Sequence, residues 1–368
     1  MRVSILGAGG VAFGTAAYLA EAGHSPMLWS PSGSSTQAFR AGAPLVAEGA
    51  IQLQFQPRIA TDCGEAVKDA DVVMVILPGF GHKATLAAIA PHLREGQPVI
   101  ISSHLSFGAL YLSGLLAARG VRAPISAWGT TLTTGKKTDA THVNVNTVRK
   151  KIDVATVPAS AADAAVALCT ELFGDRFVKR DGLLAIAVSN LNPQNHLGIA
   201  LMNLTRMERG ETWGQAQNVT PAVGRLIEAL DLERLAIAKA LGVQVRTVQE
   251  HFSLSFHVAP GSVSAMNQEM HRNGNGGFGP GTADSRYVLE DVPFGLVATA
   301  QLGRLAGVPA PLHEAGIALF SAAYGRDFTS ENDLLPAIGM ESLSLAQLKA
   351  LARDGATIGQ ASSASRPC

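Results

Sequence analysis

VSILGAGGVA, residues 3–12, is an apolar run that ends in a glycine turn, and residues 13–22 after it favour a helix. Gly7 permits the tight turn, Gly9 lets a phosphate approach the backbone, and Ala12 is small enough where the helix meets the strand. The helix N-terminus offers free N–H groups and a positive dipole end to an anion. We therefore predict a strand–turn–helix unit that binds a dinucleotide.

The composition describes a chain with a large core and a balanced charge. Hydrophobic residues make up 47% of the 368 residues and charged residues 16%, while Lys and Arg together equal Asp and Glu at 29 each. Such a balance attracts neither nucleic acid nor an anionic membrane. We expect small-molecule partners, or other copies of the chain in a homodimer. The length favours two domains.

The cysteines and the first residues bear on the cellular compartment. Cys63, Cys169 and Cys368 share no CxxC or His-paired spacing, so we expect neither a disulfide framework nor a zinc site. The chain enters its first strand without a charged leader, and no apolar run approaches about 18 residues. We predict a cytoplasmic protein with no metal and no membrane anchor.

Up to residue 181, short apolar runs alternate with helical stretches. This pattern predicts an α/β Rossmann-type N-terminal domain, residues 1–181, with a parallel sheet and helices on both faces. The expected strands are residues 3–6, 26–29, 58–60, 71–77, 98–102, 124–127, 152–157 and 177–179. The expected helices are residues 13–22, 63–68, 83–93, 107–118 and 161–173.

From residue 182 onward helical periodicity dominates, which predicts an all-α C-terminal domain over residues 182–360. Residues 259–283 are rich in Gly, Asn and Ser, so we expect a long ordered or lid-like loop there. Residues 361–368 are small and polar, and we expect a flexible tail. The expected helices are residues 183–208, 221–241, 245–251, 292–305 and 312–321.

The end of the second expected strand bears on which nicotinamide cofactor binds. An Asp or Glu there would hold the ribose hydroxyls of NAD, but the sequence has Ser30, Ser32 and, farther on, Arg40. Hydroxyls and a guanidinium suit a 2′-phosphate, so NADP is favoured over NAD, although a serine here also serves as a helix cap. The predicted cofactor site comprises Gly7, Gly9, Gly10, Ala12, Ser30, Ser32, Arg40, Pro78 and Gly79.

Pro78 and Gly79 belong to this set because ligands of such sheets bind at the carboxyl ends of the strands. We expect the loop at residues 102–104 beside the nicotinamide and the loop with Thr130 beside the substrate. His82 lies in the loop that begins with Pro78 and Gly79, and His104 lies in the loop at residues 102–104. The favoured interpretation is that neither histidine performs chemistry.

The candidate catalytic residues lie in two segments of the helical domain. NLNPQNH ends in His196, and RYVLEDVP, which starts at Arg286, contains Glu290 and Asp291. Histidine is suited to donate a proton near neutral pH, and a carboxylate usually orients its ring. Asp291 is the first choice for that carboxylate and Glu290 the second, while Arg286 offers paired donors to a substrate carboxylate. From spacing alone, a core histidine and a surface ion pair remain the alternatives.

The two segments, together with the nucleotide-binding unit, resemble the octopine and nopaline (opine) dehydrogenase family. The similarity covers residues 1 to about 325. It is strongest in Asn-Pro-x-x-His at residues 192–196 and in Arg-Tyr-x-x-Glu-Asp-Val-Pro at residues 286–293.

The resemblance implies an NAD(P)H-dependent oxidoreductase that acts on a CH–NH bond. It would condense an α-keto acid, such as pyruvate, with the amino group of an amino acid, and in reverse oxidise an N-(carboxyalkyl) amino acid. His196 and Asp291 inherit the role of catalytic dyad and Arg286 a place in the substrate pocket, to which we add Asn192 and Thr130 as substrate-binding residues. The cleft between the domains would bind the substrate.

Two other functions remain open at this stage. A 2-keto acid reductase of the ketopantoate or glycerol-3-phosphate dehydrogenase type shares the two-domain layout but relies on a lysine. Lys239 is the only lysine between residues 183 and 321, and it has no Asn or Asp nearby. A sensor without activity would bind the dinucleotide and consume none.

Overall fold

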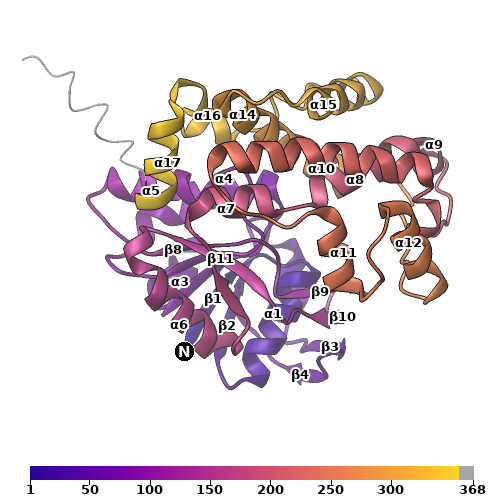
Figure 1. The fold of residues 1–368 in the computed structure, drawn as a ribbon. Helices are drawn as coiled ribbons and strands as arrows, with labels where there is room; N and C mark the ends of the chain where they lie inside the picture. The colour runs from indigo at the N-terminus through magenta and orange to yellow at the C-terminus, as the bar shows by residue number, and fades with distance from the viewer. Residues whose placement is uncertain (356–368) are drawn as a thin grey trace, which may run out of the picture. The chain divides into compact units, whose positions relative to one another are not determined.

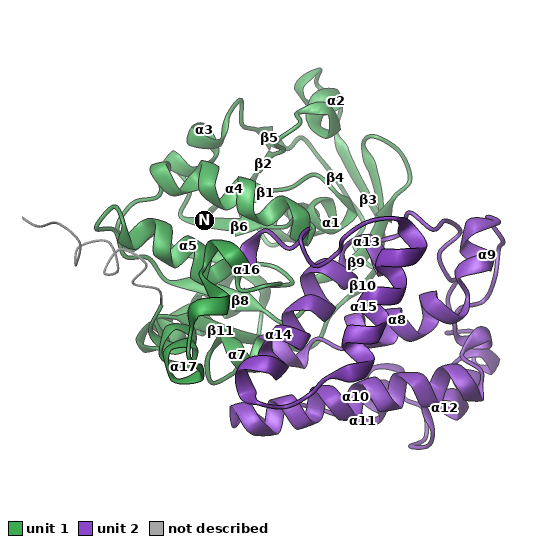
Figure 2. Cartoon of the chain, turned by 90° about the horizontal axis from the view of Figure 1, so that it is seen from above, with its two compact units in different colours: residues 1–186, 336–368 green, residues 187–335 purple. Residues whose placement is uncertain are grey.

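The computed structural model describes residues 1–355, which form two compact units (Figures 1 and 2). Unit 1 comprises residues 1–186 together with the described residues from 336 onward, and unit 2 comprises residues 187–335. The tail expected at residues 361–368 lies outside the described residues.

The division of the chain differs from the one expected at residue 181. The first residues of α7 (Gly182–Ser189) belong to unit 1, and so does α17 (Leu345–Asp354), which contacts β11 (Ile152–Val157). On the sequence both segments are expected in the domain of residues 182–360, and the helix at residues 345–354 is not among the expected ones. Helical periodicity shows which face of a helix is apolar, but it does not show which core that face packs against.

Unit 1 is built on an eight-stranded sheet that contains every strand expected from the sequence (Figure 1). The strand order is β12-β11-β8-β7-β6-β1-β2-β5. The strands from β8 to β5 are parallel, whereas β11 pairs with β8 antiparallel. No helix separates β8 from β11, and neighbouring strands without a helical crossover pair antiparallel. The other strands are β1 (Arg2–Leu6), β2 (Ser25–Trp29), β5 (Arg58–Ile59), β6 (Val72–Val75), β7 (Val99–Ile101), β8 (Ile125–Trp128) and β12 (Phe177–Lys179).

A second sheet of four strands, in the order β4-β3-β10-β9, is not among the expected elements. Helix α1 (Gly10–Glu21) contacts strands of both sheets. Two glycines give β9 room against α1, because a Cβ on Gly10 would lie 2.8 Å from the Gly135 oxygen and one on Gly14 would lie 2.9 Å from Thr133 Oγ1. The strands of this sheet are β3 (Leu45–Gly49), β4 (Leu53–Phe55), β9 (Thr133–Lys137) and β10 (His142–Val148).

The remaining helices of unit 1 agree with the expected ones, apart from the additional short α2. They are α2 (Gln37–Arg40), α3 (Cys63–Lys68), α4 (His82–Ile89), α5 (Gly108–Ala117) and α6 (Ala162–Phe173).

Unit 2 is helical, as predicted, and α10 has the expected bounds, but the single helix expected over residues 183–208 is divided. Residues 183–208 form three helices, and Pro193 stands in the first turn of the second. The loop expected at residues 259–283 is wrong over residues 263–272, which form a helix whose first turn is capped by Ser262. The helices are α8 (Asn192–Met202), α9 (Leu204–Glu208), α10 (Pro221–Leu241), α11 (Val248–Phe256), α12 (Val263–Arg272), α13 (Arg286–Leu289), α14 (Val297–Ala306) and α15 (Pro311–Tyr324), with a π-helical segment η6 (Val292–Leu296) before α14.

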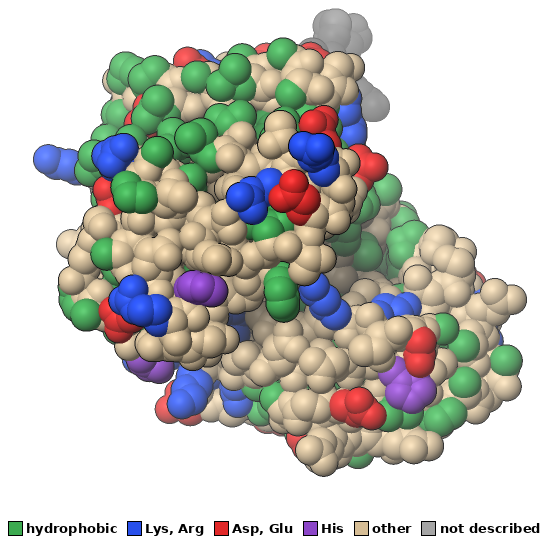
Figure 3. Space-filling model, turned by 90° about the vertical axis from the view of Figure 1, so that its right-hand side faces the viewer, with side chains coloured by type: hydrophobic (Ala, Val, Ile, Leu, Met, Phe, Trp, Pro, Cys, Tyr) green, Lys and Arg blue, Asp and Glu red, His purple; other side chains and the backbone are tan. Residues whose placement is uncertain are grey.

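Acidic and basic side chains are interspersed on the face drawn in Figure 3, in keeping with their equal numbers in the sequence. Among residues 1–355, none of the helices has the length and apolar character that crossing a bilayer requires.

Candidate active site

His196 and Asp291, the predicted catalytic pair, meet inside unit 2. His196 Nδ1 lies 2.6 Å from Asp291 Oδ2, and only 11% of the His196 side chain and 3% of the Asp291 side chain are exposed. The carboxylate accepts from Nδ1, which fixes the ring and its tautomer. Within residues 1–355, no group hydrogen-bonds His196 Nε2. This nitrogen is therefore available to exchange a proton with a bound molecule.

A proline and a glycine bring the two elements of this pair together. His196 is on α8, which has Pro193 in its first turn, and Asp291 immediately precedes η6. A Cβ on Gly295 of η6 would overlap the Pro193 ring, so the approach requires glycine at this position. π-helical turns are rare and are frequent at functional sites. The local winding therefore agrees with a functional role for Asp291.

Tyr287, which is not among the predicted site residues, stacks on His196. The ring centroids are 3.5 Å apart and the planes are inclined by 10°. Tyr287 is on α13, which lies beside α8 in unit 2 (Figure 2). The sequence did contain a signal for this residue. Tyr287 precedes Asp291 by four residues, and such a spacing places two side chains on one helical face.

Arg286 pairs with Glu290, the residue before Asp291. Arg286 Nε is 3.5 Å from Glu290 Oε2, and 59% of the Arg286 side chain is exposed. The carboxylate that meets His196 Nδ1 is that of Asp291, the first choice. Asn192 is exposed one helical turn before His196 on α8, and its backbone N–H donates to Asn190 Oδ1 at 3.0 Å.

Thr130, the remaining predicted substrate residue, belongs to unit 1. It is half-buried in the loop that follows β8. Lys239, on which the alternative reductase function depends, is exposed on α10 of unit 2.

The glycine turn of unit 1 has the features that a pyrophosphate requires. Gly7 has φ +147°, and a Cβ there would overlap the Ile76 carbonyl oxygen. Gly9 begins α1, and no atom lies within 4 Å of the place where its Cβ would be. The first turn of α1 has no side-chain cap and no acidic residue. Its backbone N–H groups are thus open to an anion. Ala12 is fully buried, as expected for the helix–strand contact.

The end of β2 lies beside this turn, since Gly7 N–H donates to the Trp29 oxygen at 2.8 Å. Ser30 Oγ and Ser32 Oγ are 3.5 Å apart. Arg40, on α2, donates from Nη2 to the Ala60 oxygen at 2.8 Å. These groups supply hydroxyls and a guanidinium at the strand end, without a carboxylate among them. Pro78 and Gly79 follow β6, and Gly79 begins a short 3-10 turn.

His82 and His104 are completely buried at the carboxyl ends of β6 and β7. Burial lowers the pKa of His82 to about 4 and that of His104 to about 3, so both rings are neutral near neutral pH. His82 Nε2 donates to the Leu77 oxygen at 2.9 Å, while His104 Nε2 accepts from Ala109 N–H at 3.2 Å. Both rings thus lie inside unit 1 with one nitrogen bonded to its backbone, which supports the interpretation without chemistry.

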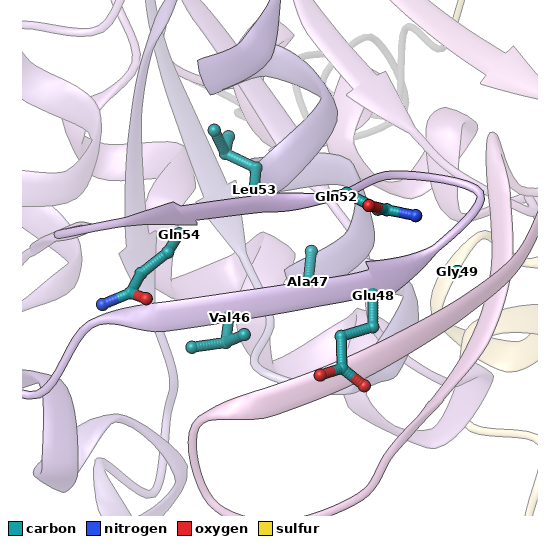
Figure 4. A pocket seen from close by; sticks show the side chains of 7 residues that line it. All are labelled: Val46, Ala47, Glu48, Gly49, Gln52, Leu53 and Gln54. Atoms are coloured by element: carbon teal, nitrogen blue, oxygen red, sulfur yellow. The ribbon is translucent and has the colours of Figure 1, made fainter.

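A groove of about 480 Å³ lies on the four-stranded sheet and contains none of the predicted site residues (Figure 4). It is lined by residues 46–49 of β3 and by residues 52–54. Glu48 is the single charged residue among them. Within the described part of the chain, no three His, Cys, Asp or Glu side chains are grouped to hold a metal ion.

Two family models match the chain. The model for the α-helical domain of NAD/NADP octopine/nopaline dehydrogenase matches residues 179–324. The model for ketopantoate reductase PanE/ApbA matches residues 3–103, within the nucleotide-binding part alone.

The chain is also similar to enzymes over almost its whole length. It is 32% identical over 352 residues to the opine dehydrogenase of Arthrobacter sp. (strain 1C), which covers 94% of this chain and 96% of the relative. The structure of octopine dehydrogenase with NADH and L-arginine superimposes with a TM-score of 0.74 at 16% identity, covering 88% of this chain and 90% of that one. Yersinopine dehydrogenase with NADP+ superimposes with a TM-score of 0.69 at 16% identity, covering 93% and 99%.

Proposed function

Because this chain belongs to the opine dehydrogenase family of NAD(P)-dependent oxidoreductases that act on a CH–NH bond, we propose that it joins an α-keto acid to the amino group of an amino acid. The keto carbon and the amine form an imine with loss of water, and reduction of the imine gives an N-(carboxyalkyl) amino acid. The reverse reaction oxidises that secondary amine.

The observation that carries this proposal is the buried His196–Asp291 pair with its open Nε2. In its charged form His196 donates the Nε2 proton to the hydroxyl that leaves as water. In its neutral form the same nitrogen takes up a proton from the substrate ammonium group, and the free amine then attacks the keto carbon. Asp291 holds Nδ1 throughout and stabilises the charged ring.

Three further residues are proposed to bind substrate. Arg286 offers a planar set of donors to a carboxylate, and its exposure leaves the guanidinium accessible. Asn192 lies one turn from His196 on α8, where an amide can orient the keto acid. Thr130 contributes a hydroxyl from the loop after β8.

We propose that the dinucleotide pyrophosphate binds at the start of α1, against Gly7 and Gly9. The open N–H groups and the missing Cβ atoms there fit such a group. Ser30, Ser32 and Arg40 would hold a 2′-phosphate, which favours NADPH over NADH. When bound, the reduced nicotinamide supplies the hydride for the imine carbon.

The function is tested by cofactor oxidation with pyruvate, 2-oxoglutarate and oxaloacetate, each against a panel of amino acids and with both NADH and NADPH. The proposal requires turnover that depends on both the keto acid and the amine. Turnover with a keto acid alone would favour the reductase alternative, in which Lys239 is the expected catalytic lysine. Cofactor binding without turnover would favour the sensor. The cytoplasmic location and the homodimer remain predictions, to be tested by cell fractionation and light scattering.

The cofactor preference has its own test in Ser30→Asp. A carboxylate at this position would accept from ribose hydroxyls and repel a 2′-phosphate. The expected result is a fall in kcat/KM for NADPH and a gain for NADH. A wild-type enzyme that already works better with NADH would overturn the NADP preference and leave the reaction unaffected.

A further inference from the structure

A chain of contacts inside unit 2 leads from the glycine-rich segment at residues 276–280 to His196. His196 is held on one edge by Asp291 and on one face by the Tyr287 ring, at 3.5 Å between centroids. Such a parallel stack restricts rotation of the imidazole, and its π face favours a cationic ring. Tyr287 thus constrains the same ring that Asp291 orients.

Tyr287 is itself fixed by one hydrogen bond. Its hydroxyl donates to Gln215 Oε1 at 2.5 Å. Burial, together with the nearby charge of Asp291, raises the pKa of Tyr287 to about 12. The phenol therefore keeps its proton near neutral pH, which makes it a constant donor to Gln215.

Gln215 belongs to residues 213–216, whose backbone pairs with the glycine-rich segment. Gln215 N–H donates to the Gly277 oxygen at 3.0 Å, and Ala216 N–H to the Gly276 oxygen at 3.1 Å. Farther along, Gly279 N–H donates to the Trp213 oxygen at 3.0 Å. The Trp213 indole N–H donates to the Pro280 oxygen at 3.0 Å. These bonds join two segments about 60 residues apart in the sequence into one short antiparallel pairing.

Glycine is needed in this pairing for steric reasons. A Cβ on Gly279 would overlap the Trp213 indole, and Gly277 has φ +61°, a left-handed conformation that other residues adopt at a cost. Phe278 between them is 77% exposed. The glycines therefore allow the backbone of residues 276–280 to lie against residues 213–216, while the Phe278 side chain is exposed to solvent.

We propose that the pairing of residues 276–280 with residues 213–216 positions the catalytic histidine through Gln215 and Tyr287. Gln215 and Tyr287 are then positioning residues for proton transfer, and the glycine-rich segment is the element that holds them. The proposal rests on the assignment of His196 as the acid–base group. It explains why a segment without a charged or nucleophilic side chain of its own is packed so closely beside the site.

Three single variants and one double variant test the contacts between Gln215, Tyr287 and His196. Tyr287→Phe keeps the stack and loses the bond to Gln215, and Gln215→Leu loses the same bond from the other side. Each should lower kcat by roughly five- to tenfold, the range of one hydrogen bond, with KM within about twofold. The double variant should be no worse than either single variant, because both remove one interaction. Tyr287→Leu removes the stack as well, so it should lower kcat further.

Gly277→Ala tests the glycine-rich segment, with Gly274→Ala as its matched control. Both glycines have positive φ and open space around the Cβ position, but only Gly277 accepts a bond from Gln215. Alanine is disfavoured in this left-handed conformation, so Gly277→Ala should loosen the pairing and lower kcat about threefold or more. Gly274→Ala should leave kcat unchanged. Tyr324→Phe is a second control, because Tyr324 donates its hydroxyl to the Ala283 oxygen away from His196.

An NMR measurement separates failure of this proposal from failure of the proposed function. The ring protons of His196, assigned by their loss in His196→Asn, should be shifted upfield by the Tyr287 ring in the wild-type protein. The shift should disappear in Tyr287→Leu and shrink in Gly277→Ala, whatever substrate the enzyme uses. Unchanged ring-proton shifts and unchanged kcat in Tyr287→Phe, Gln215→Leu and Gly277→Ala would overturn the proposal that this pairing positions His196. A His196→Asn variant with normal turnover would instead overturn the acid–base assignment.

Discussion

Four histidines are buried within the described chain, two in each unit, and they differ in their partners. In unit 1, His82 and His104 have no carboxylate beside them, and burial lowers their pKa values to about 4 and about 3. In unit 2, His196 and His313 each meet a carboxylate through Nδ1, at 2.6 Å and 2.7 Å. Burial alone thus produces neutral, inert rings, and a buried histidine needs a carboxylate to carry a charge during a reaction.

The two histidines of unit 2 differ in the second ring nitrogen. His313 is fully buried, and its Nε2 accepts from the Gln194 amide at 3.0 Å. Its partner Glu233 also accepts from the backbone N–H groups of Leu312 and His313, at the start of α15. Both nitrogens of His313 are therefore occupied by the protein. His196 keeps Nε2 open, and this difference separates a candidate catalytic pair from a structural one.

The largest expected effect comes from His196→Asn. This variant should keep the fold and the cofactor affinity but lower kcat by about 10² or more, because general acid–base groups contribute that much. Steady-state kinetics and cofactor titration measure the two quantities. His313→Gln is the matched comparison, and it should lower the melting temperature while kcat changes less than tenfold. Equal kcat losses in the two variants would remove the distinction between the pairs.

Asp291→Asn should lower kcat by roughly 10- to 100-fold, since the amide orients the ring but no longer stabilises its charged form. Its melting temperature should stay near that of the wild type, because an amide has the size of a carboxylate. Thermal denaturation beside kinetics gives both values. A large loss of stability with normal kcat would make this pair a structural one like His313–Glu233.

The sequence predicted the parts of this comparison that depend on local pattern. The glycine turn and the apolar alternation predict the eight-stranded sheet. The pairing of His196 with Asp291, 95 residues apart, was predicted through the resemblance of the two motifs to the opine dehydrogenase family. The four-stranded sheet was missed because β4 has only three residues and β9 is polar, so that pairing with β3 and β10 decides their structure. Gln215 was missed because it meets Tyr287 across 72 residues, and no local pattern reports such a contact.

The histidines of unit 1 predict acid sensitivity. Their pKa values are lowered in the folded state relative to 6.5, so the unfolded chain binds protons first as the pH falls. The free energy of unfolding should have its full value above pH 6.5. It should decrease as the pH falls toward the folded-state pKa values, by up to about 1.4 kcal/mol per pH unit for each histidine. His104→Gln, whose side-chain oxygen can still accept from Ala109 N–H, should reduce this dependence between pH 6.5 and 4. Urea denaturation over that range measures it, and an unchanged slope would show that His104 does not titrate on unfolding.

The smallest expected effect on kcat is that of Glu233→Gln, which tests the His313–Glu233 pair, where both ring nitrogens have partners. Burial by itself would raise the pKa of Glu233, but the bonds from the His313 side chain and from the Leu312 and His313 N–H groups outweigh it and lower the pKa below 4.5. The carboxylate therefore stabilises the fold above pH 4.5, and this contribution is lost as the pH falls through the folded-state pKa. At pH 7 the variant should lose about 1–2 kcal/mol of unfolding free energy, the range of a charged hydrogen bond, with kcat within about twofold of the wild type. The difference from the wild type should shrink below pH 4.5 in denaturation experiments. A tenfold fall in kcat at unchanged stability would place His313–Glu233 in the reaction, and an open Nε2 would no longer distinguish the catalytic histidine.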